Sequence, residues 1–234
     1  MLFSETIICD RKGVIMEAIE SRGVVRETDI ERDTQAPLGP LAGVTLTAQD
    51  IEAAQRARAD NPLRHVDHFA FGCRDARATR DFYERILGLP LVNTLILEDD
   101  IISKGAMYCH FFFELGDGHF LAFFEHTTLF AEGDFTPKSG FHQHVAFEVT
   151  SDETVQSFRT RLETAGVKTL YVDHGLYHSL YFTDPNGINL EVTYKAPGTR
   201  DFEAKSRKVA GKLLDDWVAQ RDHHRAASLA KVAR

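Results

Sequence analysis

The stretch HFAFGCRDARATRDFYERI at positions 68–86 returns as HVAFEVTSDETVQSFRTRL at positions 144–162. A constant shift of 76 positions aligns the two copies without a gap. It superposes these identical or similar residues: His68 on His144, Ala70 on Ala146, Phe71 on Phe147, Phe82 on Phe158, Arg85 on Arg161 and Ile86 on Leu162. Such self-similarity indicates one structural unit that is used twice.

Each copy predicts a strand followed by a helix. The opening residues alternate in the manner of a strand, and the residues that follow have apolar positions at helical spacing. Those apolar positions are Phe82, Ile86 and Leu89 in the first copy and Val155, Phe158 and Leu162 in the second. We expect the helices to end at Gly88 and Gly166, because glycine readily adopts the left-handed conformation that ends helices.

Further strand-like runs follow each helix, at 101–114 and 119–125 in the first copy and at 168–172, 179–183 and 188–194 in the second. Residues 116–118 and 184–187 between them are rich in residues that favour turns. Each copy is therefore βαβββ, with one sheet face covered by its helix and the other bare. We predict an α+β fold in which the paired modules form a curled mixed sheet around a metal-binding cleft, followed by a C-terminal helix.

The chain divides into four predicted parts. Residues 1–60 form an N-terminal extension, in which Thr47 and Asp50 resemble a capping box for a short helix near 48–58. Residues 64–130 and 140–196 are the two modules, and residues 200–234 are a helical tail whose amphipathic spacing suits packing on its own domain, a subunit contact or a lid. Phe130 and Phe135 lie in the long connection between the modules, where they could line a substrate pocket.

Strand alternation selects the candidate metal ligands. If the apolar residues of the strands face the helices, His68, His144 and Glu191 face the cleft. The two histidines occupy equivalent positions in the repeat, and a carboxylate in an apolar strand is costly unless it is paired or bound to a metal. Two imidazoles and one carboxylate suit a redox metal and leave coordination positions open.

Composition limits the other classes of function. With 43% apolar residues the chain can form a normal core, and the net charge of -8 argues against a nucleic-acid partner. The three cysteines, Cys9, Cys73 and Cys109, have no metal-type spacing, so we expect reduced thiols. We find no membrane-spanning run and no export signal in the sequence. We therefore expect a cytoplasmic protein with no membrane partner. We also expect a homo-oligomer.

The paired modules and the order of residues in the second copy resemble a known family. Val172-x-His174, Leu180-Tyr181, Asp184-Pro185-x-Gly187 and Glu191 are similar to the C-terminal pattern of extradiol ring-cleaving dioxygenases, and His119-Phe120-Leu121-Ala122-Phe123 to their strand motif. These enzymes belong to the vicinal oxygen chelate superfamily, with glyoxalase I and the bleomycin-resistance proteins. The resemblance covers residues 64–196 and is closest to enzymes with a single module pair.

The resemblance implies a non-haem Fe(II) dioxygenase, with Mn(II) as a second possibility, that cleaves a catecholic or hydroquinone-like ring with O2. It implies that His119 exchanges a proton beside the metal and that Tyr181 hydrogen-bonds the substrate. His174 would orient or deprotonate the substrate, although His178 in the same loop competes for that role. The substrate would be a small aromatic diol.

Two alternatives remain open. A glyoxalase-like isomerase or lyase of the same superfamily would need a fourth ligand, for which Glu125 is the nearest carboxylate. Its side chain is expected on the opposite strand face, so it would reach the site only through a bulge or a register shift. A ligand-sequestering protein without catalysis would have no need of the three metal ligands.

Overall fold

The computed structural model describes residues 41 and 43–232, with side chains up to residue 221. The strand-like patch predicted at residues 7–9, which includes Cys9, and the loop predicted at residues 36–40 lie outside the described part of the chain. The remaining cysteines, Cys73 and Cys109, are both free thiols, as expected.

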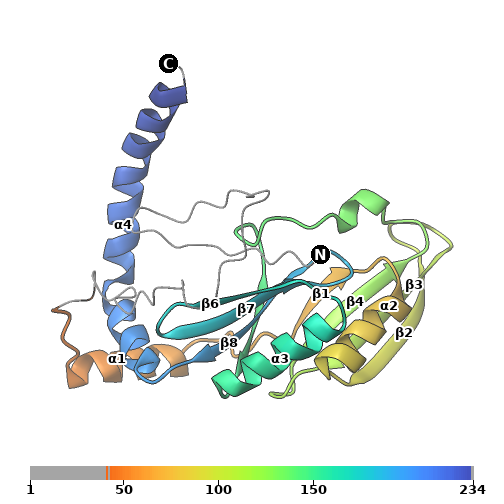
Figure 1. Ribbon diagram of the computed structural model, residues 1–234, viewed down its shortest axis with the longest axis horizontal. Helices are drawn as coiled ribbons and strands as arrows, with labels where there is room; N and C mark the ends of the chain where they lie inside the picture. Colours follow the sequence, from red (N-terminus) through yellow and green to blue (C-terminus); the bar gives the residue numbers. More distant parts are fainter. Residues whose placement is uncertain (1–40, 42, 233–234) are drawn as a thin grey trace. The chain divides into compact units, whose positions relative to one another are not determined.

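The first module has the predicted βαβββ order (Figure 1). Its elements are β1 (His68–Gly72), α2 (Ala76–Arg80) continued by the π-helical η3 (Asp81–Leu87), β2 (Leu91–Asp99), β3 (Ala106–Glu114) and β4 (Phe120–His126). The strands form a mixed sheet in the order β1-β4-β3-β2, in which β1 and β4 are parallel.

The strands predicted after the first helix need two corrections. Strand β2 was not predicted. The strand predicted at 101–114 begins only at Ala106, because residues 100–105 form the turn between β2 and β3. The reason is the side chain of Asp99, which accepts hydrogen bonds from the backbone N–H groups of Ile101, Ile102 and Ser103. These bonds hold the apolar Ile101 and Ile102 in an exposed turn.

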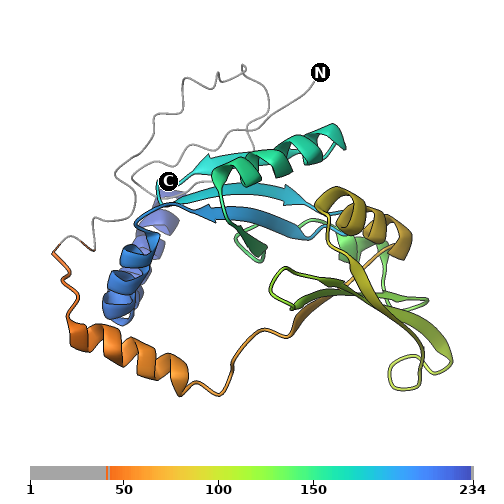
Figure 2. The same cartoon turned by 90° about the horizontal axis from the view of Figure 1, so that it is seen from below.

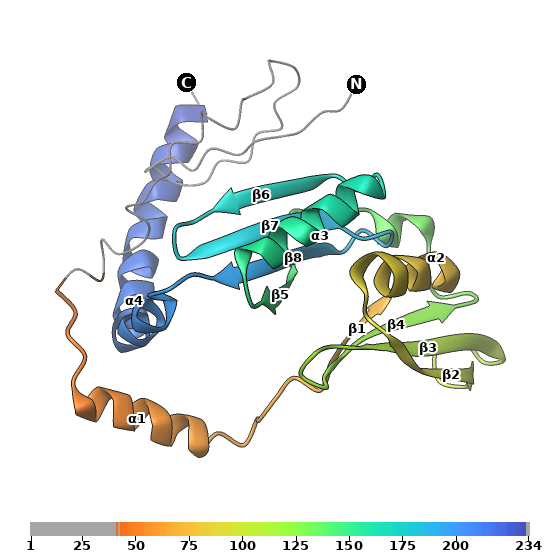
Figure 3. The ribbon, with the colours of Figure 1, turned by 60° about the horizontal axis from the view of Figure 1, so that its bottom comes forward.

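The second module repeats the plan with β5 (Val145–Val149), α3 (Asp152–Thr164), β6 (Thr169–Asp173), β7 (Tyr177–Thr183) and β8 (Asn189–Lys195). Its sheet has the order β5-β8-β7-β6, again with a parallel pair formed by the first and last strands. Helix α3 lies along one face of this sheet, and the opposite face is not covered by a helix of this module (Figure 2, Figure 3). A short 3₁₀ helix, η4 (Glu132–Phe135), lies in the connection between the modules.

Equivalent residues cap the helices of the two modules. Asp75 accepts a hydrogen bond from the N–H of Ala78, and Ser151, 76 positions later, accepts one from the N–H of Thr154. Gly88 and Gly166 have the predicted left-handed backbone at the helix ends. The repeat in the sequence is therefore a repeat of helix signals as well as of strands.

One hydrophobic core joins the two modules. It contains residues of η3, β3 and β4 together with residues of α3, β7 and β8. Phe82 and Phe182 meet in it with ring centroids 6.3 Å apart. Because the helix-covered faces of both sheets contribute to the same core, their open faces lie outside it. The predicted α+β fold of two paired modules followed by a C-terminal helix is confirmed; the two sheets remain separate and form no closed barrel.

The helices outside the modules form a second unit. Helix α1 (Ala48–Ala59) has the predicted capping box between Thr47 and Asp50. Lys208 of α4 (Thr199–Val232) bonds Asp50 at 2.8 Å and the carbonyl of Thr45 at 2.9 Å, which ties the two helices together. Among the described residues, no helix combines the length and apolarity needed to cross a bilayer.

Candidate metal centre

His144 and Glu191 meet on the open face of the second sheet, as predicted. Strands β5 and β8 pair with Ala146 beside Glu191, which brings the residue at the start of β5 next to the carboxylate. The Nε2 atom of His144 lies 3.2 Å from Oε2 of Glu191. Leu190 and Val192, on either side of Glu191, face the core, so strand alternation directs the carboxylate to the open face.

The hydrogen bonds of His144 indicate what this pair can bind. Its Nδ1 lies 3.0 Å from the carbonyl of Gly140, and a carbonyl only accepts, so Nδ1 carries the proton. The neutral ring then has a bare lone pair on Nε2, facing the oxygen lone pairs of Glu191. Two such groups at 3.2 Å need a proton or a cation between them. Imidazole nitrogen and carboxylate oxygen are donors that Fe(II) and Mn(II) accept, so the pair fits a metal.

Tyr181 and His174 lie beside the pair. Tyr181 is opposite Glu191 across β7 and β8, and its ring centroid is 6.4 Å from that of His144. Its hydroxyl is 3.4 Å from Nε2 of His174. Burial, together with the negative charge of Glu191, raises the pKa of Tyr181 above its ordinary value. Four of the six predicted site residues therefore form one cluster on the second sheet.

His178 has a different environment from His174. Its Nδ1 is 2.9 Å from Asp152 at the start of α3, and its Nε2 is 3.6 Å from Asp173. Both nitrogens thus face carboxylates within the helix-bearing side of the module. Of the two competing histidines, His174 is the one that lies beside Tyr181.

His68 stands on the open face of the first sheet. Its Nδ1 donates to the carboxylate of Asp67 at 2.6 Å, which leaves Nε2 as a bare acceptor. Its ring lies beside Phe112 and His110, at 5.7 and 6.2 Å between centroids. Within the part of one chain that the structure describes, no three His, Cys, Asp or Glu side chains are grouped to hold a metal.

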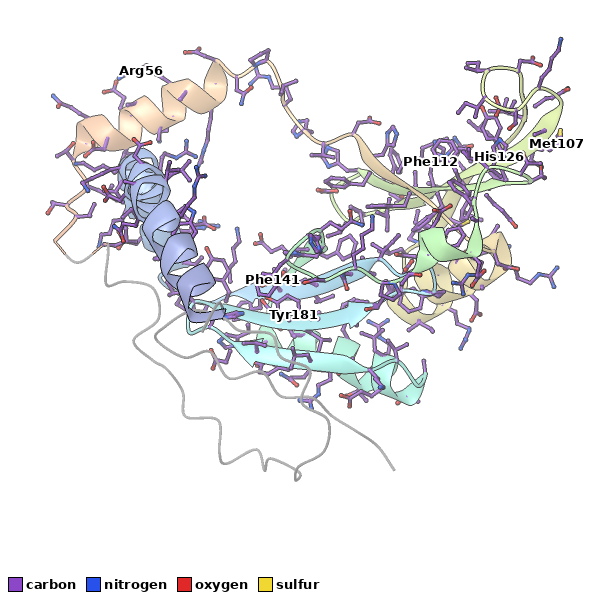
Figure 4. All side chains as sticks on the ribbon, turned by 90° about the horizontal axis from the view of Figure 1, so that it is seen from above. Arg56, Met107, Phe112, His126, Phe141 and Tyr181 are labelled. Carbon is purple, nitrogen blue, oxygen red and sulfur yellow. The ribbon has the colours of Figure 1, made fainter. Side chains whose placement is uncertain are left out.

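The expectation that His68, His144 and Glu191 converge within one chain is therefore corrected. The physical reason is the shared core. It buries the helix-covered faces of both sheets and leaves the two open faces outside it. Figure 4 shows Phe112 on the first sheet and Tyr181 on the second, the neighbours of the two parts of the predicted ligand set.

His119 is also separate from the cluster on the second sheet. Its Nδ1 is 3.0 Å from Asp117, and its ring centroid is 5.0 Å from that of His65. It precedes β4 with the same parity as Leu121 and Phe123, which face the core, whereas His68 faces the open side. The family resemblance implied that His119 lies beside the metal. The structure instead places it away from His144 and Glu191.

Glu125 lies on the helix-covered side of β4, as expected from strand alternation. Its Oε2 accepts a hydrogen bond from the N–H of Ala76, the first residue of α2. It therefore supports the start of a helix and does not face the open side.

Phe130 and Phe135 line a cavity of about 140 Å³ together with Gly72 and Asn186. The Phe130 ring lies against Gly72, where an added Cβ would come within 2.7 Å of it. The cavity does not include the ligand candidates, so the two aromatic residues line a pocket apart from them.

Sequence reasoning did not single out His110. It shares the open face of the first sheet with His68. The missing signal was strand parity: Phe111 and Phe113 belong to the core, so His110 and Phe112 must point to the other side.

Comparison with known proteins identifies the class. Residues 65–192 match the model of the Glyoxalase/Bleomycin resistance protein/Dioxygenase superfamily. The match spans more than half of the chain, and the chain belongs to this superfamily. None of the curated proteins matches the chain.

Several solved structures are similar to part of the chain. A glyoxalase/bleomycin resistance protein/dioxygenase domain from Frankia sp. EAN1pec is 20% identical and covers 57% of this chain and 99% of its own, with a TM-score of 0.47. A glyoxalase/dioxygenase from Nostoc punctiforme is 26% identical over 58% and 94% of the two chains, with a TM-score of 0.42. The fosfomycin resistance protein FosX from Listeria monocytogenes, solved with Mn(II) and sulfate, is 20% identical. The match covers 59% of this chain and 98% of FosX, with a TM-score of 0.42.

Proposed function

We propose that this protein is a non-haem Fe(II)-dependent extradiol dioxygenase that cleaves a small catecholic ring with O2, with Mn(II) as the alternative metal. The observation that carries the proposal is the approach of His144 Nε2 to Glu191 Oε2 at 3.2 Å. The other ring nitrogen, Nδ1, donates a hydrogen bond to the carbonyl of Gly140. When bound there with a second imidazole, the metal would hold the diol and O2 at adjacent open positions.

The second imidazole is His68 of another copy of the chain. A metal with three facial protein ligands needs His68 in addition to His144 and Glu191. Within one chain, His68 lies on the open face of the first sheet, whereas His144 and Glu191 lie on that of the second. In the described part of the chain β1 and β5 each form an edge of their sheet, and the open face of the first sheet exposes apolar side chains, with Leu95 and Leu97 each 42% exposed. Exposed edges and apolar surface favour association, so a homo-oligomer would complete the site.

Two side chains of the cluster have the chemistry to handle substrate protons. The hydroxyl of Tyr181 can donate a hydrogen bond to a substrate oxygen, and the imidazole of His174, 3.4 Å from that hydroxyl, can accept a proton in turn. Both lie on the same sheet face as Glu191, so a diol held at the pair would be within their reach.

The position of Glu125 favours this function over the glyoxalase-like alternative. A fourth protein ligand would occupy a place that the diol or O2 needs, and Glu125 is engaged at the N-terminus of α2. A ligand-sequestering protein would not need the matched His144 and Glu191 pair.

The proposal is tested with protein purified and loaded with iron under nitrogen. We expect tight metal binding and O2 uptake with a catechol, giving a yellow ring-opened product. The His144→Ala variant should lose both the metal and the uptake, whereas His178→Gln, which alters a histidine bound to Asp152, should keep both. Wild-type protein that binds iron but consumes no O2 with any of a panel of catechols would contradict the dioxygenase assignment.

Mixing inactive variants tests the shared site. In a dimer of His68→Ala and His144→Ala chains, one site carries both substitutions and the other carries neither. Random mixing should therefore restore about a quarter of the wild-type activity per chain, because half of the dimers are mixed and each has one intact site of two. Absence of any recovery, with mixed dimers verified by mass, would show that His68 acts within its own chain or not at all.

A further inference from the structure

His110 is held in place on the open face of the first sheet by its surroundings. Its ring stacks on Phe124 with centroids 3.7 Å apart and planes 5° apart, and Phe112 lies against it at 4.2 Å. His68 completes the group at 6.2 Å. We call these four residues the aromatic cradle: His68, His110, Phe112 and Phe124.

The hydrogen bond of His110 fixes which nitrogen is available. Its Nδ1 lies 3.0 Å from the carbonyl of Phe123, which can only accept, so Nδ1 carries the proton. The Nε2 atom is then a bare acceptor, and among the described residues it has no hydrogen-bond partner. A fixed ring with one committed nitrogen and one free acceptor is arranged to receive a donor from a ligand.

The other residues of the cradle indicate the kind of donor. Phe112 is half-buried and lies 5.7 Å from the His68 ring, so it presents an aromatic wall beside both histidines. Aromatic walls favour a flat ring through offset or edge-to-face contacts. A flat ring that carries hydroxyl groups would pair its π-system with Phe112 and a hydroxyl proton with His110.

We propose that the aromatic cradle binds the ring of the substrate, with His110 Nε2 accepting a hydrogen bond from a ring hydroxyl and Phe112 forming the wall. The inference rests on the proposed function, because the cradle takes part only if His68 joins His144 and Glu191 at one metal. It makes His110 a residue that determines specificity for hydroxylated aromatic rings.

His110 is better placed for this contact than His119. The ring of His119 lies beside His65, and its Nδ1 faces Asp117, whereas His110 shares the open face with His68. A substrate hydroxyl beside His68 is therefore closer to the free nitrogen of His110.

The test measures binding of 4-nitrocatechol by titration calorimetry under nitrogen, with metal content determined on the same samples. His110→Phe keeps a ring on Phe124 but removes the acceptor, and we expect it to raise the Kd about tenfold at unchanged metal content. His110→Gln supplies an amide oxygen acceptor and should restore part of the affinity. The control His65→Gln should bind as the wild type does.

A second probe separates the hydrogen bond from the wall. The compound 1,2-dimethoxy-4-nitrobenzene has the same ring without hydroxyl donors, so wild type and His110→Phe should bind it equally weakly. Phe112→Leu should weaken both probes. Equal affinity of wild type and His110→Phe for 4-nitrocatechol would overturn the inference, as would a rise in Kd confined to His119→Gln or no binding by the wild type.

The two proposals fail in different ways. If the wild type binds 4-nitrocatechol with the expected variant pattern but consumes no O2, the reaction is wrong and the role of His110 in binding stands. If O2 uptake occurs but His110→Phe binds normally, the reaction stands and the cradle is wrong. Circular dichroism of each variant verifies that it is folded.

Discussion

The hydroxyl of Tyr83 in η3 donates a hydrogen bond to Asp184 Oδ2 over 3.1 Å, although the two residues are 101 positions apart. The Asp-Pro-Asn-Gly turn that resembles a family motif thus serves as the joint between the modules. Asn186 of the same turn accepts a hydrogen bond from the N–H of Arg74 and donates one to Thr79. The contact links the helix-covered sides of the two modules at the edge of the core that they share.

Removing the Tyr83 hydroxyl should loosen this joint. Tyr83 is fully buried and Asp184 is 5% exposed, so Tyr83→Phe leaves a buried carboxylate without one of its donors. We expect the free energy of unfolding to fall by about 1–3 kcal/mol, measured by denaturant titration. Tyr171→Phe, which removes a less buried bond to Asp152, is the control and should cost less. An equal loss in both variants would contradict a special role for the joint.

Gly187 should tolerate a side chain less well than Gly118. Both have left-handed backbones, with φ of +77° and +82°, so alanine costs about 1–2 kcal/mol at either position. At Gly187 the new Cβ would also clash with the carbonyl oxygen of Phe135, whereas Gly118 faces open space. We therefore expect Gly187→Ala to be clearly the more destabilising of the two in thermal unfolding. Similar unfolding temperatures would be inconsistent with the close packing of η4 on the turn.

The pair of Asp99 and His126 predicts an acid-sensitive turn. Hydrogen bonds from the Ile102 N–H, from His126 and from neighbouring backbone groups lower the pKa of Asp99 to about 2. A carboxyl whose folded pKa lies below its ordinary value of 3.8 stabilises the fold above about pH 4, and this contribution is lost as the pH falls towards 2. The stability difference between wild type and Asp99→Asn should therefore be constant from pH 7 to 5 and shrink below pH 4.

Unfolding curves between pH 7 and 3 measure that difference. Asp100→Asn, at the exposed neighbouring position, serves as the control for the change in net charge. If the stability difference between wild type and Asp99→Asn grows as the pH falls, the assigned direction of the pKa shift is wrong.

Metal binding should distinguish the carboxylate of Glu125 in β4 from that of Glu191 in β8. Glu191→Gln removes a proposed ligand and should weaken metal binding at least about tenfold. Glu125→Gln alters the contact with Ala76 and should leave the metal content unchanged while lowering stability slightly. Equilibrium dialysis with Mn(II) measures both. Metal loss in Glu125→Gln at unchanged stability would favour the four-ligand class.

The sequence was sufficient for much of the fold. The capping box of Thr47 and Asp50, the glycines after the helices and the alternation around Phe147 and Leu190 are local signals, and each is confirmed. Strand β2 was missed because Ile101 and Ile102 look like strand residues, and only the Asp99 side chain shows that they belong to a turn.

The candidate site was only partly predictable. Parity within a strand correctly placed His144 and Glu191 on one face, because neighbouring strands in register share their faces. Parity would also have found His110 on the face of His68. The choice between His174 and His178 depended on which of them folds back against Tyr181, which is a matter of loop conformation.

By itself, the sequence determined the repeat of two βαβββ modules and the strand faces on which His68, His144 and Glu191 lie, since both follow from residues a few positions apart. Only the tertiary structure decided which faces of the modules meet. Packing of Tyr83, Phe82 and Phe182 buries the helix-covered faces in a common core and leaves His68 on one open face and His144 with Glu191 on another. The burial of apolar surface between segments 100 residues apart, which no local pattern encodes, is the reason.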